Sequence, residues 1–228
     1  MASFAIPQPR GPVDTLRLSE FFVSIQGEST YVGRPCVFVR TAGCHLVCHY
    51  CDTRYAASFS IGDEVSVADI VSRVQQAGVP LVLLTGGEPL LQCGSFTLMK
   101  ALLDLGFTVL LETSGSCSIA NVDERVVCIV DFKAPGSRES EHNHYDNIDH
   151  LLPHDEVKIV LSDHIDYTWA KDLLYYFELD KRCTVLLSPV FGQLNPKDLA
   201  EWIMSDRLPV RMQVQLHKVI WPEESRGV

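Results

Sequence analysis

The sequence has no long hydrophobic run, no excess of positive charge and no secretory signal. Its longest apolar runs are short, such as Val79–Leu84, whereas a membrane span needs about 20 apolar residues. Lys and Arg number 19 against 29 Asp and Glu, so the net charge of −10 is opposite to that of a nucleic-acid-coating protein. The N-terminus lacks a basic segment followed by an apolar stretch. We therefore expect a cytoplasmic protein that binds neither membrane nor nucleic acid.

Common nucleotide-binding patterns are also missing. The chain has neither a Walker phosphate loop nor a dinucleotide fingerprint, which argues against an NTPase or a Rossmann enzyme. Its 228 residues suit one domain that buries most of its apolar surface. Residues 1–15 hold three prolines and no hydrophobic period. We predict a flexible N-terminal tail over residues 1–15 and a single domain over residues 16–228.

Short apolar runs alternate with helical periods from Leu16 onward. Several runs are continuously apolar and β-branched, as in strands buried on both faces. The alternation predicts an α/β fold of parallel βα units, with the loops after Thr85, Glu112, Phe132 and Ser188 on one face. The expected strands are Leu16–Val23, Cys36–Ala42, Leu81–Thr85, Thr108–Glu112, Val126–Phe132, Glu156–Leu161, Thr184–Ser188 and Val210–Val214.

Four helices are expected between these strands. Ser66 and Asp69 resemble a capping box, and the apolar residues that follow them repeat at helical spacing. A second stretch with apolar residues at helical spacing ends at Gly106. Further helices are expected over Tyr167–Glu178 and Pro196–Met204, the latter opened by Asn195 as its cap.

Eight cysteines need an explanation in a chain without a secretory signal, since disulfides are rare in the cytosol. Five are scattered, and we interpret them as small buried side chains: Cys36, Cys93, Cys117, Cys128 and Cys183. The other three, Cys44, Cys48 and Cys51, are spaced C-x3-C-x2-C on one loop. Thiolates favour zinc or iron–sulfur clusters. A structural zinc site needs a fourth ligand, which His45 or His49 could supply, whereas a 4Fe–4S cluster on three cysteines leaves one iron open.

The cysteine loop resembles that of the radical S-adenosylmethionine (SAM) enzymes, including the aromatic Tyr50 before the third cysteine. Thr85-Gly86-Gly87-Glu88-Pro89 follows a strand, where the Gly-Gly-Glu segment of that superfamily receives the methionine amine of SAM. Two glycines allow the backbone to approach a cofactor closely. Glu112-Thr113-Ser114-Gly115 ends the next strand in a similar way.

Motifs on both sides of the cysteines narrow the resemblance to one family. Gln26-Gly27-Glu28 precedes the cysteines and Cys51-Asp52-Thr53 ends them, and Gln215-Leu216-His217-Lys218 lies near the C-terminus. Together with Arg40 and Thr85, they are similar to the 7-carboxy-7-deazaguanine synthases over about residues 16–228. Activating enzymes of glycyl-radical proteins share the cysteine spacing and are the alternative, followed by a zinc-dependent binding module.

The resemblance implies an incomplete TIM-like (β/α) barrel that works as a carbon–nitrogen lyase. The family converts 6-carboxy-5,6,7,8-tetrahydropterin to 7-carboxy-7-deazaguanine with release of ammonia, on the route to queuosine. A 4Fe–4S cluster with three cysteine ligands, recycled SAM and Mg²⁺ are implied as cofactors. The implied partners are the pterin substrate, an electron donor such as flavodoxin or ferredoxin, and a second copy of the chain in a homodimer.

The resemblance also implies residue roles. Cys44, Cys48 and Cys51 would hold the cluster, Thr53 would bind Mg²⁺, and Glu112 would be catalytic. The implied SAM contacts are Gly87, Asp131, Phe132, Lys133, Ser188, Pro189, Val190 and Phe191. The implied pterin contacts are Ile25, Gln26, Gly27, Glu28, Arg40, Thr85, His217 and the Val228 carboxylate.

Two of these implications have separate chemical arguments. Arg40 suits a substrate carboxylate, because a guanidinium presents two parallel donors. Val219, Ile220 and Trp221 form an apolar anchor that gives the C-terminal segment a reason to dock. One departure stands against the pattern, since many relatives have Ser-Pro-Lys where this chain has Asp131-Phe132-Lys133.

Overall fold

A nine-stranded sheet runs through the part of the chain that the computed structural model describes, residues 5–222 and 226–228. The strands lie in the order β3-β1-β2-β4-β5-β6-β7-β8-β9. From β2 along the sheet to β9 every neighbouring pair is parallel, whereas β1 is antiparallel to β2 and β3. The strands are β1 (Thr15–Ile25), β2 (Pro35–Thr41), β3 (Asp63–Ser66), β4 (Leu81–Gly86), β5 (Thr108–Thr113), β6 (Val127–Asp131), β7 (Glu156–Leu161), β8 (Thr184–Pro189) and β9 (Arg211–Met212).

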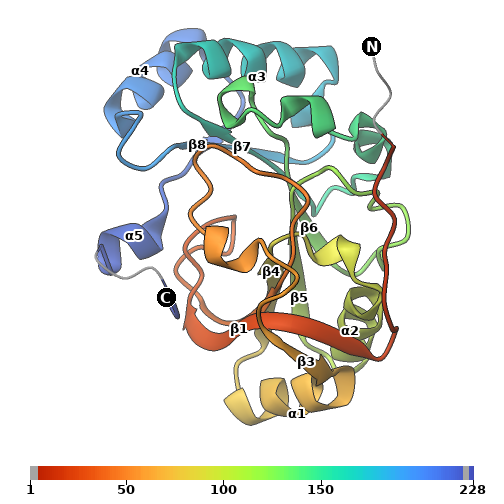
Figure 1. The fold of residues 1–228 in the computed structure, drawn as a ribbon. Helices are drawn as coiled ribbons and strands as arrows, with labels where there is room; N and C mark the ends of the chain where they lie inside the picture. The colour runs from red at the N-terminus through yellow and green to blue at the C-terminus, as the bar shows by residue number, and fades with distance from the viewer. Residues whose placement is uncertain (1–4, 223–225) are drawn as a thin grey trace.

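Four helices, α1 to α4, pack on one face of this sheet, whereas α5 lies beside the cavity on the other face. In Figure 1, α3 and α4 lie beside β7 and β8, and α1 and α2 lie at the other end of the sheet near β3. Among the described residues, no helix has the length and apolar character that crossing a membrane requires. The α-helices are α1 (Val67–Ala77), α2 (Cys93–Asp104), α3 (His164–Tyr176), α4 (Pro196–Asp206) and α5 (Leu216–Ile220).

The sheet separates two apolar clusters. Alternating strand residues such as Val37 and Val39 pack with the helices in a large outer core. Phe38, between them, belongs to a smaller inner cluster with Leu83 and Ile129. Within the described residues, β3 and β9 form the two edges of the sheet and do not pair with each other. The arrangement confirms the predicted incomplete (β/α) barrel, with a small inner face that is free to line a site.

Two predicted helix caps are confirmed, whereas the helix expected over Tyr167–Glu178 begins earlier, at His164. The Ser66 hydroxyl accepts from the Asp69 amide at 3.0 Å and donates to its carboxylate at 2.7 Å, which caps α1. Asn195 caps α4, with Pro196 in its first turn. The second predicted period becomes α2, which begins at Cys93 and ends two residues before Gly106.

The sequence prediction missed one strand and one helix and made another strand too long. β3 was not expected, because Asp63-Glu64-Val65-Ser66 is an exposed, polar edge strand without an apolar pattern. The predicted strand Val210–Val214 is reduced to the two residues of β9. α5 was missed because five residues are too few to show a helical period.

The N-terminal segment touches the folded chain at Arg10. The Arg10 amide donates to the Leu91 carbonyl at 2.8 Å, and the Cys93 amide donates to the Arg10 carbonyl at 3.0 Å. This short parallel bridge places Arg10 beside the start of α2. The flexible character expected of residues 1–15 stays a prediction, and residues 1–4 lie outside the described part of the chain.

Candidate active site

A cavity of about 510 Å³ lies inside the open barrel and reaches the carboxyl ends of its strands. The segments after β4, β5, β6 and β8 line it from this end, as the sequence predicts. The loop after β1 enters from the opposite end, because β1 is antiparallel to β2 and Ile25 pairs with Pro35. The expected site residues that line the cavity are Ile25, Gln26, Gly27, Glu28, Arg40, Cys44, Cys48, Cys51, Thr53, Thr85, Gly87, Glu112, Asp131, Lys133, Val190, Phe191, His217 and Val228.

Three expected SAM contacts do not line the cavity. Phe132 is fully buried in the outer core, with its ring centroid 5.6 Å from that of Tyr145. Ser188 and Pro189 are also buried, at the end of β8. Alternation along a strand explains the difference for Phe132, because it points away from the face that carries Asp131 and Lys133.

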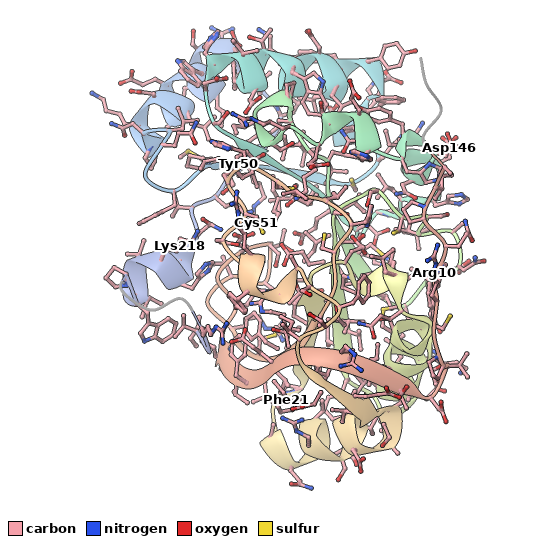
Figure 2. All side chains as sticks on the ribbon, in the orientation of Figure 1. Arg10, Phe21, Tyr50, Cys51, Asp146 and Lys218 are labelled. Atoms are coloured by element: carbon pink, nitrogen blue, oxygen red, sulfur yellow. The ribbon has the colours of Figure 1, made fainter. Side chains whose placement is uncertain are left out.

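The cysteine loop is fixed to β7 and to the segment that follows β6. The Tyr50 hydroxyl donates to the Val160 carbonyl of β7 at 3.0 Å, and the His49 amide donates to the Ser137 carbonyl at 2.9 Å. Arg54 donates to the carbonyls of Cys48 and His49 at 3.3 and 2.8 Å. Figure 2 shows Tyr50 and Cys51 near the middle of the molecule, on the side of Lys218. The loop is thus held by contacts that leave its three thiols facing the cavity.

The three cysteines suit a cluster better than one metal ion. All eight cysteines are free, and four of the five scattered ones are buried, with Cys93 partly buried. In the described part of the chain, no three His, Cys, Asp or Glu side chains surround a single metal position. An iron–sulfur cluster does not require such convergence, because each thiolate binds a different iron. Burial raises the pKa of Cys44 to about 12 and of Cys48 to about 11, so cluster binding has to displace their protons.

Gly87 packs directly under the cysteine loop. The Gly87 amide donates to the Thr41 carbonyl at 3.0 Å, and the Glu88 amide donates to the Gly43 carbonyl at 2.8 Å. A Cβ at Gly87 would lie 2.1 Å from the Gly43 oxygen, a contact that no side chain can make. Glycine at position 87 therefore keeps the Gly-Gly-Glu segment against the residue that precedes Cys44.

Glu88 ties together the loops after β4 and β5. Its side chain is fully buried, and its carboxylate accepts from the Ser114 amide at 2.7 Å and hydroxyl at 2.6 Å. It also accepts from the Thr113 hydroxyl at 2.9 Å and the Leu90 amide at 3.0 Å. The Gly-Gly-Glu-Pro motif thus contributes a buried anchor as well as a backbone approach to the cavity.

Asp131 and Lys133 form a buried ion pair on the cavity wall, with 2.9 Å between Oδ2 and Nζ. Burial alone would lower the pKa of Lys133, but the Asp131 carboxylate raises it above its usual value. Asp131 Oδ1 is buried and has no hydrogen-bond partner within the described residues. A buried carboxylate oxygen without a donor is a place where a ligand hydroxyl or N–H would be bound.

Arg40 is partly engaged by another residue. Its Nε donates to Glu20 Oε2 at 2.9 Å, and the Tyr55 hydroxyl donates to the same oxygen at 2.7 Å. Both Arg40 and Glu20 are largely buried. The guanidinium has five N–H donors, so its terminal nitrogens can still bind an anion in the cavity.

Thr53 precedes a short helical turn but does not cap it. Its side chain makes no cap hydrogen bond to the turn at Arg54–Ala56. Its hydroxyl lies 3.8 Å from the Cys51 sulfur and faces the cavity. The Thr53 hydroxyl therefore does not cap the helical turn, although Thr53 stands at the capping position.

The C-terminal segment closes one side of the cavity. The Leu216 amide donates to the Gly27 carbonyl at 3.0 Å, and a Cβ at Gly27 would lie 2.3 Å from His217 Nδ1. Burial lowers the pKa of His217. Val228 lines the cavity and lies near the end of β1 in Figure 1. The segment docks, but the predicted apolar anchor is wrong, because Val219 and Ile220 are 63% and 43% exposed. Backbone and polar contacts hold the segment instead.

Lys218 joins the C-terminal segment to the cysteine loop. Its Nζ lies 2.8 Å from Asp52 Oδ2. Burial opposes ionisation of Asp52, but the Lys218 ammonium outweighs it and lowers the pKa of this carboxyl to about 2. The residue that follows Cys51 is therefore charged at any ordinary pH, and it holds α5 over the cavity.

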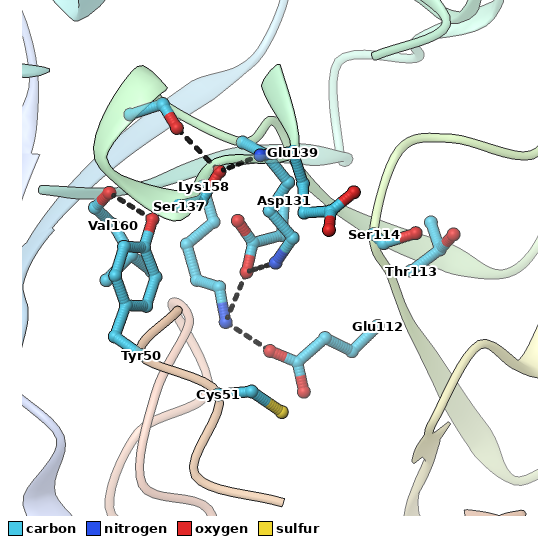
Figure 3. Close-up of polar contacts among 12 residues, drawn as sticks. Tyr50, Cys51, Glu112, Thr113, Ser114, Asp131, Ser137, Glu139, Lys158 and Val160 are labelled. Atoms are coloured by element: carbon cyan, nitrogen blue, oxygen red, sulfur yellow. Dashed lines mark hydrogen bonds and ion pairs between the residues drawn. The ribbon is translucent and has the colours of Figure 1, made fainter. Parts of the chain in front are cut away.

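Sequence reasoning missed Lys158, at the centre of the cavity wall. Its Nζ contacts Glu112 and lies 3.4 Å from Asp131 Oδ2 (Figure 3). It also lies 2.7 Å from Glu28 Oε2. These carboxylates outweigh burial and raise the pKa of Lys158 well above its usual value. The signal was present in the sequence, since Glu156 and Lys158 are charged residues at alternate positions of an otherwise apolar strand.

Comparisons with known proteins agree on the family. The model of the radical SAM superfamily matches residues 38–126. A 7-carboxy-7-deazaguanine synthase of Chlorobaculum tepidum is 49% identical over 93% of this chain and 97% of its own length. One from Koribacter versatilis is 41% identical over 93% of this chain and 100% of its own.

Solved structures agree on the fold. QueE from Escherichia coli superposes with a TM-score of 0.74 at 22% identity, covering 89% of this chain and 95% of that one. Streptococcus suis SuiB bound to its precursor peptide gives a TM-score of 0.60 at 11% identity, over 82% of this chain and 50% of that one. Both are similar in architecture, and the sequence relatives carry the family assignment.

Replacing Glu88 by alanine should lower the free energy of unfolding by about 3 kcal/mol, because buried donors lose a charged acceptor. Urea denaturation measures this difference. Glu64→Ala is the matched control, since Glu64 is exposed and its ion pair with Arg17 spans 3.7 Å; its effect should stay below about 1 kcal/mol. Equal losses in the two variants would contradict the anchoring role of Glu88.

Proposed function

Because this chain belongs to the 7-carboxy-7-deazaguanine synthases, within the radical SAM superfamily, we propose that it converts 6-carboxy-5,6,7,8-tetrahydropterin to 7-carboxy-7-deazaguanine with release of ammonia. One observation carries the proposal. The cysteine loop and a wall of carboxylates that can accept from a pterin lie in the same cavity. The chain spans nearly the whole length of these relatives.

Cys44, Cys48 and Cys51 would hold the 4Fe–4S cluster, with one iron left open for SAM. Together the reduced cluster and SAM supply the radical chemistry that removes a hydrogen atom from the substrate. Gly87 provides the close backbone approach for SAM, and Asp131 Oδ1 provides an acceptor without a partner in the described chain. Val190 and Phe191, which follow β8, also line the cavity.

The pterin would lie against the inner barrel wall. Glu28 and Glu112 present carboxylates to a ligand whose amino group and ring N–H groups are donors. Arg40 offers its terminal nitrogens to the pterin carboxylate, and Thr85 holds Glu112 through a hydrogen bond of 3.0 Å. Gln26, Gly27 and His217 complete this side, where the loop after β1 meets α5.

Glu112 is the proposed catalytic carboxylate. Burial opposes its ionisation, but the Lys158 ammonium outweighs it, so the pKa of Glu112 lies below its usual value. Glu112 is therefore an anion that accepts hydrogen bonds and orients the substrate, rather than an acid that donates a proton at neutral pH.

The proposal extends to partners and location. A homodimer and an electron donor such as flavodoxin or ferredoxin are proposed from the family resemblance alone. The cytoplasm is proposed because the cysteines are free thiols and the cluster needs a reducing compartment. Neither the glycyl-radical activase nor the zinc-binding module is favoured, since the relatives over most of the chain are deazaguanine synthases.

The direct test is anaerobic reconstitution with iron and sulfide, followed by incubation of the reduced enzyme with SAM and the pterin. We expect 7-carboxy-7-deazaguanine and ammonia, detected by mass spectrometry and enzymatic assay. Cys48→Ala should lose iron and all product, whereas Cys93→Ala, outside the cavity, should keep both. SAM cleavage without any turnover of the pterin would overturn the proposed function while leaving the superfamily assignment intact.

Thr53 is the proposed protein ligand of Mg²⁺, a hard ion that takes oxygen ligands and retains water or substrate oxygens. Its hydroxyl faces the cavity and makes no cap hydrogen bond. Thr53→Ala should reduce the stimulation of turnover by Mg²⁺ about tenfold and leave iron content unchanged. Thr168→Ala, on the exposed surface of α3, is the control. A full magnesium response in Thr53→Ala would remove this residue from the site.

The Val228 carboxylate is proposed to accept from the pterin at the closed side of the cavity. Adding three residues after Val228 would move this charge and crowd the cavity. The pterin KM should rise about tenfold, with iron content and SAM affinity unchanged. The same three residues added before Met1 serve as the control. An unchanged KM in the C-terminally extended enzyme would show that the carboxylate has no role in binding.

A further inference from the structure

Lys158 lies on the inner face of β7, a strand whose residues are apolar except for Glu156 and Lys158. Val157, Ile159 and Leu161 point into the outer core, so Lys158 points into the barrel. Only 6% of its side chain is exposed. An ammonium in such a place is strongly unfavourable unless it is fully paired.

Three carboxylates from three different segments surround this ammonium. Glu28 follows β1, Glu112 belongs to β5, and Asp131 ends β6. Their oxygens contact Lys158 Nζ, at 2.7 Å for Glu28 and 3.4 Å for Asp131. Figure 3 shows the lysine side chain reaching between Glu112 and Asp131. Because an ammonium has three hydrogens, none is left for a ligand in the cavity.

The cluster carries more negative than positive charge. Lys133 is the second ammonium, and it contacts Asp131 at 2.9 Å. Three carboxylates therefore share two ammoniums. A buried ion cluster is poor at stabilising a fold compared with apolar packing, so stability does not explain these residues. The surplus of negative charge points to a ligand that donates hydrogen bonds.

The carboxylates of Glu28 and Glu112 are held at both oxygens. Gln215 donates to Glu28 Oε1 at 2.7 Å, while Lys158 holds Oε2. Thr85 donates to Glu112 Oε2 at 3.0 Å, while Lys158 holds Oε1. Each carboxylate oxygen has two acceptor sites, so each keeps one for a ligand. Lys158 is the only one of these donors that both carboxylates share.

We propose, on the basis of the proposed function, that Lys158 is a positioning residue for the pterin. It holds Glu28 and Glu112 as a fixed pair of anions that receive the pterin N–H groups, and it does not touch the pterin itself. Asp131 also contacts Lys133. If Lys158 is removed, the Lys133 ammonium still balances Asp131 on the SAM side of the cavity. Loss of Lys158 should therefore weaken the pterin and spare SAM.

The first experiment measures both ligands in the reconstituted holoenzyme. Lys158→Met should raise the pterin Kd at least tenfold, while iron content and SAM Kd change less than threefold. Lys171→Met removes an exposed lysine that contacts Asp206, and it is the matched control for a lost ammonium. Equal losses of iron, SAM and pterin binding would indicate a structural role, and an unchanged pterin Kd would indicate no role.

The second experiment tests whether Lys158 acts through the two carboxylates. In a Glu28→Gln/Glu112→Gln background, the additional Lys158→Met change should alter the pterin Kd less than threefold. In this triple variant Asp131 keeps its pair with Lys133, and no other charge of the cluster is left unpaired. We therefore expect it to fold even if Lys158→Met alone does not. The pterin is titrated to millimolar concentration, so that the higher Kd values of these variants can be measured.

The two experiments separate the possible results. A loss of the same size in the neutral background and in the wild type would mean that Lys158 binds the pterin directly, which overturns the positioning role. A wild-type holoenzyme that binds SAM but no pterin would instead overturn the proposed function. Loss of pterin binding only when the carboxylates are present supports the inference.

Discussion

Charge balance inside the barrel is the constraint on which the rest of the site depends. The Lys158 ammonium meets Glu28, Glu112 and Asp131, which come from segments far apart in the sequence. Without an ammonium at that point, their carboxylates would repel one another in a region shielded from water. The strands can therefore bring acceptors to one cavity only because one cation from β7 stands between them.

The cavity is built from both ends of the barrel. Cysteine-bearing and glycine-bearing loops cover the carboxyl ends of the parallel strands, as is usual for α/β folds. The loop Gln26–Glu28 enters from the amino end because β1 is antiparallel, and α5 binds to this loop through the Gly27 carbonyl. The C-terminal segment then reaches the cysteine loop through Lys218 and Asp52. A substrate between these parts would touch residues from both ends of the chain.

Local patterns predicted what depends on local chemistry. Apolar runs located the buried strands, Ser66 and Asn195 located two helix starts, and the cysteine spacing located a loop that lines the cavity. The family resemblance, rather than periodicity, supplied the substrate residues. Residues whose role depends on tertiary contacts were missed: Lys158 has meaning only beside carboxylates from other strands, and Phe132 turned into the core although its neighbours face the cavity.

A crystal structure of the anaerobically reconstituted enzyme with SAM and the pterin tests the central claim most directly. The account predicts the cluster on Cys44, Cys48 and Cys51, SAM between it and Asp131, and the pterin N–H groups on Glu28 and Glu112. Lys158 would keep its contacts to both carboxylates and lie beyond hydrogen-bond distance of the pterin. A pterin bound outside this cavity, or within it with its N–H groups turned away from both carboxylates, would contradict the account.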